Sequence, residues 1–210
     1  VDDNSNKENL SQIRKIIENK NIDIEPLDYS KYKDIIKNQK NQETYANLAS
    51  LLRCFEIGKE KGKDLIFFIE DDYLFKQSSF EELIFSYSRI STLIDNDIFM
   101  CPTDYVFYYD SNYLTSLFIG KNHRWRVVKE TLLTFLFSKK LFNKFKNNIR
   151  LVGEKENIPF EGPLHKIFDQ SPCLAPVKST CYHLSRSVPG IESDWLEIWK
   201  KYFVKINGGP

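Results

Sequence analysis

The sequence lacks several features that would assign a protein to a class at once. Its longest apolar run, residues 65–69, has the length of a strand and falls far short of the roughly 18–20 residues that a membrane-spanning helix needs. Its first residues show no secretory signal. Its 30 basic and 29 acidic residues leave a net charge of +1, without the basic excess that general nucleic-acid binding requires. We therefore expect no membrane-spanning segment and no nucleic-acid partner.

Cysteine is scarce as well. The four cysteines, Cys54, Cys101, Cys173 and Cys181, form no CxxC pair and lack the spacing of zinc ligands. Unpaired cysteines are among the residues most often buried, and they persist in reducing compartments. We therefore expect four free thiols, mostly buried, in a cytoplasmic protein.

What the sequence does contain is enough apolar material for a substantial core. Hydrophobic residues make up 41% of its 210 residues, with 16 Phe and 11 Tyr, which excludes intrinsic disorder. At about 100–200 residues per domain, this length predicts a single domain spanning 1–210.

The first half of the sequence alternates predicted helices with apolar strands. Helices are expected over 46–61 and from Ser78 or Ser79, where Ser78 with Glu81 and Ser79 with Glu82 both match the capping box. The run DLIFFI at 64–69 is continuously apolar, as in a strand covered on both faces of a parallel sheet. Residues 97–101 form the next apolar segment. This alternation predicts an α/β fold with a central, mostly parallel, Rossmann-like sheet and flanking helices.

The second half is richer in strands. A hairpin is expected from 113–119 and 125–129 around Gly120. Further strands are predicted over 131–137, 173–177 and 179–183, and further helices from Ser138 to about 147 and over 161–168 and 194–204. Near the start of the chain, a helix over 5–17 and a short strand over 22–24 are also predicted.

Three adjacent acids follow the first apolar strand. Glu70, Asp71 and Asp72 come directly after DLIFFI, and in open α/β sheets ligands bind outside the carboxyl ends of the strands. Adjacent carboxylates repel one another, so such a cluster either binds a divalent cation or forms a solvated turn. Oxygen ligands suit Mg²⁺ or Mn²⁺, which can bridge a carboxylate to a diphosphate.

Several segments carry a resemblance to a known family. DLIFFIEDDYLF at 64–75 resembles the DxD region of GT-A glycosyltransferases, and VDDNS at 1–5 resembles the end of the second strand in their large inverting family. CPTDY at 101–105, HRWR at 123–126, TLLTFLFSK at 131–139 and STCYHLSRSVPGIESDW at 179–195 resemble later segments of a bacterial subgroup. The resemblance covers the chain from Val1 to about Trp199 and implies a GT-A-like sheet with a hairpin on the acceptor side. The family's first strand would precede Val1.

The resemblance implies a metal-dependent enzyme that transfers a sugar, with inversion, from a nucleotide-diphosphate donor such as a UDP-sugar. The acceptor would be a glycan or a lipid-linked saccharide. Residues 1–102 would bind the donor and 103–205 the acceptor. Asp72 and His183 would bind Mn²⁺ or Mg²⁺, with His123 and His165 as competing histidines. The residues that would contact the nucleotide sugar are Asp2, Asp3, Glu70, Asp71, Arg124, Arg126 and Arg186.

Inverting transfer needs a carboxylate that deprotonates the acceptor hydroxyl. Glu161, which follows Pro159-Phe160 at a predicted helix start, lies where the family often carries this base. It could equally complement the helix dipole. Asp104, just beyond a strand end, is the alternative base. Tyr105, Tyr108 and Tyr109 could stack on a sugar or pack in the core.

Two other functions are left open. A sugar nucleotidyltransferase would also use carboxylate-bound Mg²⁺, and a non-catalytic carbohydrate-binding module would use the aromatic residues alone. For the transferase we expect a cytoplasmic location, with a peripheral contact to the inner membrane left open.

Overall fold

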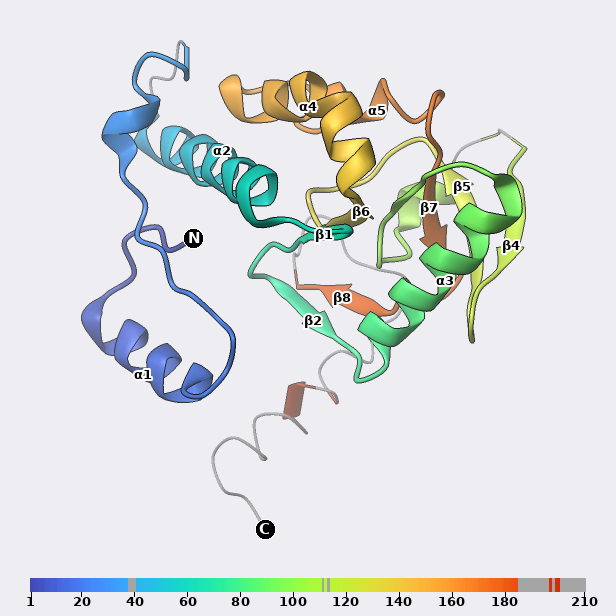
Figure 1. The fold of residues 1–210 in the computed structure, drawn as a ribbon, viewed down its shortest axis with the longest axis horizontal. Coiled ribbons are helices and arrows are strands. Elements are labelled where there is room, and N and C mark those ends of the chain that lie inside the picture. The colour runs from blue at the N-terminus through green and yellow to red at the C-terminus, as the bar shows by residue number, and fades with distance from the viewer. Residues whose placement is uncertain (38–40, 111, 113, 185–196, 198, 201–210) are drawn as a thin grey trace. The chain divides into compact units, whose positions relative to one another are not determined.

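The computed structural model describes residues 1–37, 41–110, 112, 114–184, 197 and 199–200. These residues form two compact units (Figure 1). The first comprises Val1–Gly62 and Phe145–Leu164, and the second comprises Lys63–Lys144 and the described residues from His165 onward. The division into a donor half, 1–102, and an acceptor half, 103–205, stays a prediction, and the two units divide the chain at other positions.

The first unit is helical. Its elements are α1 (Lys7–Ile17), the 3-10 helix η1 (Tyr29–Tyr32), α2 (Gln42–Lys61) and the second part of α4 (Lys139–Glu154), which departs from helical geometry at Phe145. A cluster of Tyr32, Ile36, Leu48, Ala49 and Leu52 forms its core.

Helix α1 begins close to where the sequence predicts a helix, and Asn6 caps it: the Asn6 side chain accepts a hydrogen bond from the Asn9 amide at 2.8 Å. The strand expected over 22–24 does not form. Instead, Asp2 makes an isolated parallel bridge with Pro26.

The second unit contains both sheets. The six-stranded sheet has the order β1-β6-β3-β7-β5-β4, and β2 pairs with β8 in a sheet of two strands. The helical segments of this part of the chain are α3 (Ser79–Ile94), the 3-10 helix η2 (Val106–Tyr108), the start of α4, and the end of α5 (Gly162–His165). The strands are β1 (Leu65–Phe68), β2 (Tyr73–Phe75), β3 (Phe99–Met100), β4 (Leu117–Ile119), β5 (Arg124–Val128), β6 (Phe135–Ser138), β7 (Cys173–Pro176) and β8 (Cys181–His183).

The expected GT-A-like, Rossmann-like parallel sheet is wrong. The protein has an α/β fold whose six-stranded sheet is mixed and mostly antiparallel, and only β3 and β7 pair in parallel. The reason is β6, which lies between β1 and β3 and runs antiparallel to both. An apolar run such as that of β1 predicts burial but carries no information on strand direction. Because β1 and β3 are both antiparallel to β6, they run in the same direction, and their carboxyl ends lie at the same edge of the sheet.

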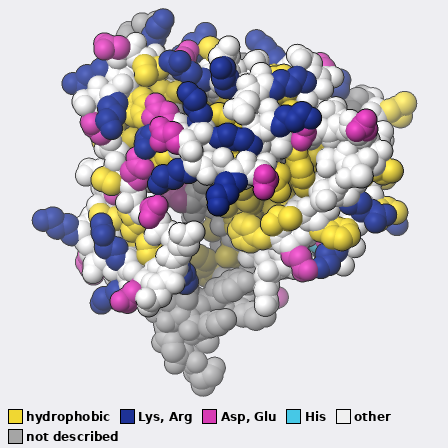
Figure 2. All heavy atoms as spheres, viewed as in Figure 1, with side chains coloured by type: hydrophobic (Ala, Val, Ile, Leu, Met, Phe, Trp, Pro, Cys, Tyr) yellow, Lys and Arg dark blue, Asp and Glu magenta, His cyan; other side chains and the backbone are white. Residues whose placement is uncertain are grey.

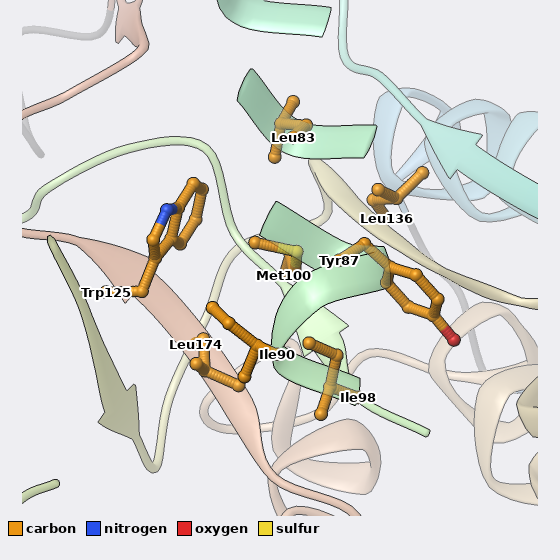
Figure 3. Close-up of a cluster of buried hydrophobic side chains, with 8 residues drawn as sticks. All are labelled: Leu83, Tyr87, Ile90, Ile98, Met100, Trp125, Leu136 and Leu174. Atoms are coloured by element: carbon orange, nitrogen blue, oxygen red, sulfur yellow. The ribbon is translucent and has the colours of Figure 1, made fainter. Parts of the chain in front are cut away.

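One face of this sheet packs against α3. Leu83, Tyr87 and Ile90 of α3 meet side chains from four strands or their flanks (Figure 3). The opposite face carries stacked and tilted phenylalanine rings, with Phe99 against Phe137 and Phe168. The members of the α3 cluster that come from the sheet side are Ile98, Met100, Trp125, Leu136 and Leu174.

A single buried carboxylate joins α3 to the β4–β5 hairpin. Glu82 is 1% exposed, and it accepts hydrogen bonds from the Asn122 amide at 2.7 Å and from Trp125 Nε1 at 3.1 Å. Gly120 lies against this carboxylate so closely that a Cβ at that position would overlap Glu82 Oε1 and Ser86 Oγ. The hairpin itself was correctly predicted from the sequence.

The charge distribution on the surface and the state of the cysteines agree with what the sequence predicts. Basic and acidic side chains are interspersed on the face shown in Figure 2. All four cysteines are free, and Cys101, Cys173 and Cys181 are buried, as expected. Within the described ranges, no helix combines the length and the apolar character needed to cross a bilayer.

Candidate functional site

The pairing of β2 with β8 brings Asp72 and His183 together. After β1 the chain passes through the acidic run into β2, where Tyr73 lies directly opposite His183 of β8. The Leu184 amide donates to the Asp72 carbonyl at 2.8 Å and extends this pairing by one step. As a result, His183 Nε2 lies 2.9 Å from Asp72 Oδ2. The two residues predicted as metal ligands therefore form a hydrogen-bonded pair in the second unit.

Each member of this pair has a buried polar atom that lacks a partner. Asp72 Oδ1 and His183 Nδ1 are both shielded from solvent and make no hydrogen bond. The Asp72 side chain as a whole is 47% exposed, whereas that of His183 is 9% exposed. Buried polar atoms are nearly always satisfied in proteins, so the Asp72–His183 pair has hydrogen-bonding capacity that the described residues do not use.

Two tyrosines surround the histidine. The ring of Tyr73 stacks on His183 with centroids 4.7 Å apart and planes 11° from parallel. Tyr105 meets the same imidazole edge-on, at 6.1 Å and 90°. The hydroxyls of Tyr73 and Tyr105 are hydrogen-bonded to each other. Burial raises the pKa of both tyrosines, so both hydroxyls stay protonated at neutral pH.

The other two acids of the run have different surroundings. The Glu70 amide donates to Thr134 Oγ1 at 3.0 Å, and this ties the end of β1 to the approach of β6. Asp71 is exposed. Of the three acids, Asp72 is the one that the structure pairs with His183.

Asp104 follows β3 at the same edge of the sheet, and it is already engaged. Asp104 is 4% exposed and Arg126 is 7% exposed. Arg126 Nη2 donates to Asp104 Oδ1, and the Tyr109 hydroxyl donates to Oδ2 at 2.7 Å. The Arg126 guanidinium also lies 3.9 Å from the centroid of the Tyr109 ring. To accept a proton from a substrate, Asp104 would have to give up part of this buried network.

The remaining predicted residues are not brought into these contacts. Arg124 is exposed on β5, opposite Ile119, and Arg186 lies outside the described residues. Asp2, Asp3 and Glu161 belong to the first unit, where Glu161 directly precedes α5. Their roles stay predictions.

The two competing histidines, His123 and His165, make contacts elsewhere in the fold. His123 Nδ1 lies 3.3 Å from Glu82 Oε2 beneath the hairpin. His165 Nε2 accepts a hydrogen bond from the Thr131 amide at 3.2 Å. Neither contact involves Asp72, so His183 is the histidine that the fold brings to the acidic run.

The pair can hold a divalent cation only with help from a ligand. Among the described residues, no group of three or more His, Cys, Asp and Glu side chains is placed to bind a metal ion. Asp72 and His183 therefore provide two donors, but Nε2 and Oδ2 are hydrogen-bonded to each other at 2.9 Å, so a cation held by these two atoms would replace the proton between them. Mg²⁺-type sites often combine one or two protein ligands with waters and substrate phosphates. For a cation of that kind, Asp72 and His183 would supply the two protein ligands.

Reasoning from the sequence missed Tyr73 and Thr134. Tyr73 directly follows the acidic run, but no spacing separates a tyrosine that stacks on a distant histidine from one that packs in a core. Tyr105 and Tyr108 are buried and Tyr109 is 52% exposed, so only Tyr109 keeps a surface of the kind expected for sugar stacking. The register of β2 with β8 is the information that places Tyr73, and it arises only in the folded chain.

The geometry stands without support from relatives. Comparisons of the sequence with protein-family models and with curated proteins find no match.

Proposed function

We propose that the protein is a divalent-cation-dependent glycosyltransferase that takes a sugar from a nucleotide-diphosphate donor, a UDP-sugar, and transfers it to a glycan or a lipid-linked saccharide. The observation that carries this proposal is the Asp72–His183 pair, whose side chains lie 2.9 Å apart at the edge of the sheet where β1 and β3 end. The resemblance of the surrounding EDD segment to DxD regions supports it.

Asp72 and His183 would hold Mn²⁺ or Mg²⁺. When bound, the cation supplies Lewis-acid stabilisation of the diphosphate leaving group. The half-exposed side chain of Asp72 gives the ligand access, whereas the buried ring of His183 supplies a fixed donor. A site with two protein donors leaves coordination positions for phosphate oxygens, so cation and nucleotide should bind together more tightly than either does alone.

Inverting transfer also needs a base for the acceptor hydroxyl. Asp104 is the weaker of the two candidates, because Arg126 and Tyr109 each occupy one of its oxygens. Glu161, in the first unit, is the other candidate. A cytoplasmic location with a peripheral contact to the inner membrane belongs to the same proposal, since a lipid-linked acceptor would lie at that surface.

Thermal unfolding with UDP, with Mn²⁺ and with both together tests the proposal. A ligand at about 100 times its Kd stabilises the folded state by about 2.7 kcal/mol, which is easily measured. We expect the parent protein to be stabilised most by UDP with Mn²⁺, and the variant Asp72→Asn to lose that synergy. The matched control is Asp64→Asn, which removes an exposed carboxylate near the other end of β1 and should behave like the parent.

The same measurement separates the alternatives. A sugar nucleotidyltransferase would be stabilised by a nucleoside triphosphate and a sugar phosphate rather than by UDP. A carbohydrate-binding module would show no shift with UDP and Mn²⁺. Either result would overturn the proposed transferase, as would an Asp72→Asn variant that keeps the full synergy.

A further inference from the structure

The imidazole of His183 is confined on two sides. Tyr73 covers one face of the ring at 4.7 Å, and Tyr105 stands against it at 90°. A substantial rotation of the histidine about its side-chain bonds would drive it into one ring or the other. The direction in which Nε2 points, toward Asp72, is therefore set by these two neighbours together with the hydrogen bond to Asp72 itself.

The two tyrosines are in turn fixed to each other and to the core. Their hydroxyls are hydrogen-bonded, and Tyr73 is 9% and Tyr105 0% exposed. Tyr105 also stacks on Phe107 at 5.0 Å and meets Tyr108 edge-on at 5.7 Å. A buried hydroxyl without a partner costs about 1–3 kcal/mol, so the bond between the hydroxyls favours one mutual position of the two rings. The core therefore fixes Tyr105, Tyr105 holds Tyr73 through the hydroxyl bond, and Tyr73 restrains His183 by stacking on it.

This arrangement does more than fill space. Phenylalanine would pack in the same volume without the cost of burying a hydroxyl, but it would lose the hydrogen bond that links the two rings beside His183. Binding sites need their donors held within about 0.5 Å of the productive position. Hydrogen-bonding groups that orient a metal-binding histidine commonly change metal affinity 10- to 100-fold when they are removed, and a ring stacked on the histidine restricts its orientation in a similar way.

We infer that Tyr73 and Tyr105 are positioning residues for cation binding, Tyr73 by stacking on His183 and Tyr105 by holding Tyr73 in place. This inference rests on the proposed function, because it assumes that His183 is a ligand of the cation. It assigns to the tyrosine pair a role in metal affinity that is separate from its contribution to the core.

The test is a Mn²⁺ titration of the full chain with saturating UDP, in which the electron paramagnetic resonance signal reports free and bound Mn²⁺. Tyr73→Leu removes both the stacked ring and the hydroxyl, and we expect about tenfold weaker Mn²⁺ binding and an altered spectrum of the bound ion. Tyr73→Phe and Tyr105→Phe keep the rings but remove the hydroxyl bond, and we expect a measurable but smaller loss of Mn²⁺ affinity than for Tyr73→Leu.

Tyr87→Phe is the matched control. Tyr87 is buried in α3, and its hydroxyl donates to Asp97 at 2.9 Å, so this variant also loses a tyrosine hydrogen bond within the second unit. We expect it to bind Mn²⁺ like the parent. Circular dichroism confirms that each variant is folded, and if Tyr73→Leu does not fold, the two phenylalanine variants decide the question.

The outcomes distinguish the two proposals. If the parent binds no Mn²⁺ in the presence of UDP, the proposed function fails and this inference fails with it. If the parent binds and the folded Tyr73 and Tyr105 variants bind equally well, only the positioning role is overturned. A loss of the same size in Tyr87→Phe would also overturn it, because the effect would then follow from general destabilisation.

Discussion

Replacing Glu82 by glutamine should destabilise the second unit strongly, although the two side chains have nearly the same shape. The Glu82 carboxylate is surrounded by donors and is 1% exposed. A glutamine must place its NH₂ group where one carboxylate oxygen was. In either orientation of the amide, this NH₂ donor would face a hydrogen-bond donor that the carboxylate oxygen had accepted from. The five donors that the carboxylate accepts from are Ser86 Oγ, the amides of Lys121, Asn122 and His123, and Trp125 Nε1.

The glutamine amide can take two orientations, and the expected destabilisation is that of the orientation that loses fewer hydrogen bonds. If the NH₂ group takes the Oε2 position, it faces the Asn122 amide, whose bond of 2.7 Å is lost. A hydrogen bond to a charged group contributes about 1.5–3 kcal/mol, and a buried donor left unsatisfied costs about 1–3 kcal/mol. Because both ranges describe the same lost bond, we expect the free energy of unfolding to fall by roughly 1.5–3 kcal/mol, a substantial part of the ~5–15 kcal/mol typical of a folded protein.

Urea unfolding followed by far-UV circular dichroism measures this change. The control is Glu81→Gln, whose side chain is 67% exposed and pairs with Lys121 at the surface. A surface pair of this kind contributes only about 0.2–1 kcal/mol. The reasoning is refuted if Glu82→Gln unfolds within about 0.5 kcal/mol of the control variant.

The same carboxylate should make stability depend on pH. Burial alone would raise the pKa of Glu82, but hydrogen bonds from Ser86, Asn122 and Trp125 outweigh burial and hold it below its ordinary value of 4.5. A carboxyl group with a lowered pKa in the folded state stabilises the protein above the pKa of the unfolded chain, and this contribution is lost as the pH falls through the folded value. Below about pH 4.5 the parent should therefore lose stability more steeply than Glu82→Gln.

Two further substitutions test the same part of the molecule. Gly120→Ala should lower the free energy of unfolding by about 1–3 kcal/mol, because the added methyl overlaps the Glu82 carboxylate; Gly162→Ala, where the Cβ would meet only Pro159 at 3.7 Å, should unfold like the parent. Asp104→Asn should cost about 3–5 kcal/mol in urea unfolding because it leaves the buried Arg126 without its carboxylate, and adding Arg126→Met should recover part of that loss. An Asp104→Asn variant as stable as the parent would contradict the buried ion pair.

Local features of the fold could be predicted because their causes are local. The spacing of apolar residues in α2 and α3 is a property of each segment, and the Gly120 turn marks the β4–β5 hairpin. The direction of β1 could not be predicted, because its partner β6 lies about 70 residues further along the chain. A continuously apolar segment is compatible with both parallel and antiparallel pairing.

The capping box shows the same limit on a smaller scale. Ser78 and Ser79 with Glu81 and Glu82 match its pattern, yet Ser78 makes no capping hydrogen bond through its side chain. Glu82 instead binds the hairpin amides of Lys121 and Asn122. At the candidate site, the grouping of Asp72 with His183 came from a resemblance between sequences. The stacking of Tyr73 on His183 depends on a strand register that no local pattern encodes.

The position of β6 between β1 and β3 also constrains the order in which the chain can acquire its structure. The ribosome adds about 5–20 residues per second, so β1 leaves it roughly 4–15 s before the segment that will pair with it at Leu65–Ser138. During that interval the apolar β1 segment is exposed to water without its partner strand, and exposed apolar surface of this kind makes folding intermediates prone to aggregation. Long-range closure of this kind is slow, and the centre of the sheet is therefore completed only after most of the polypeptide has been synthesised.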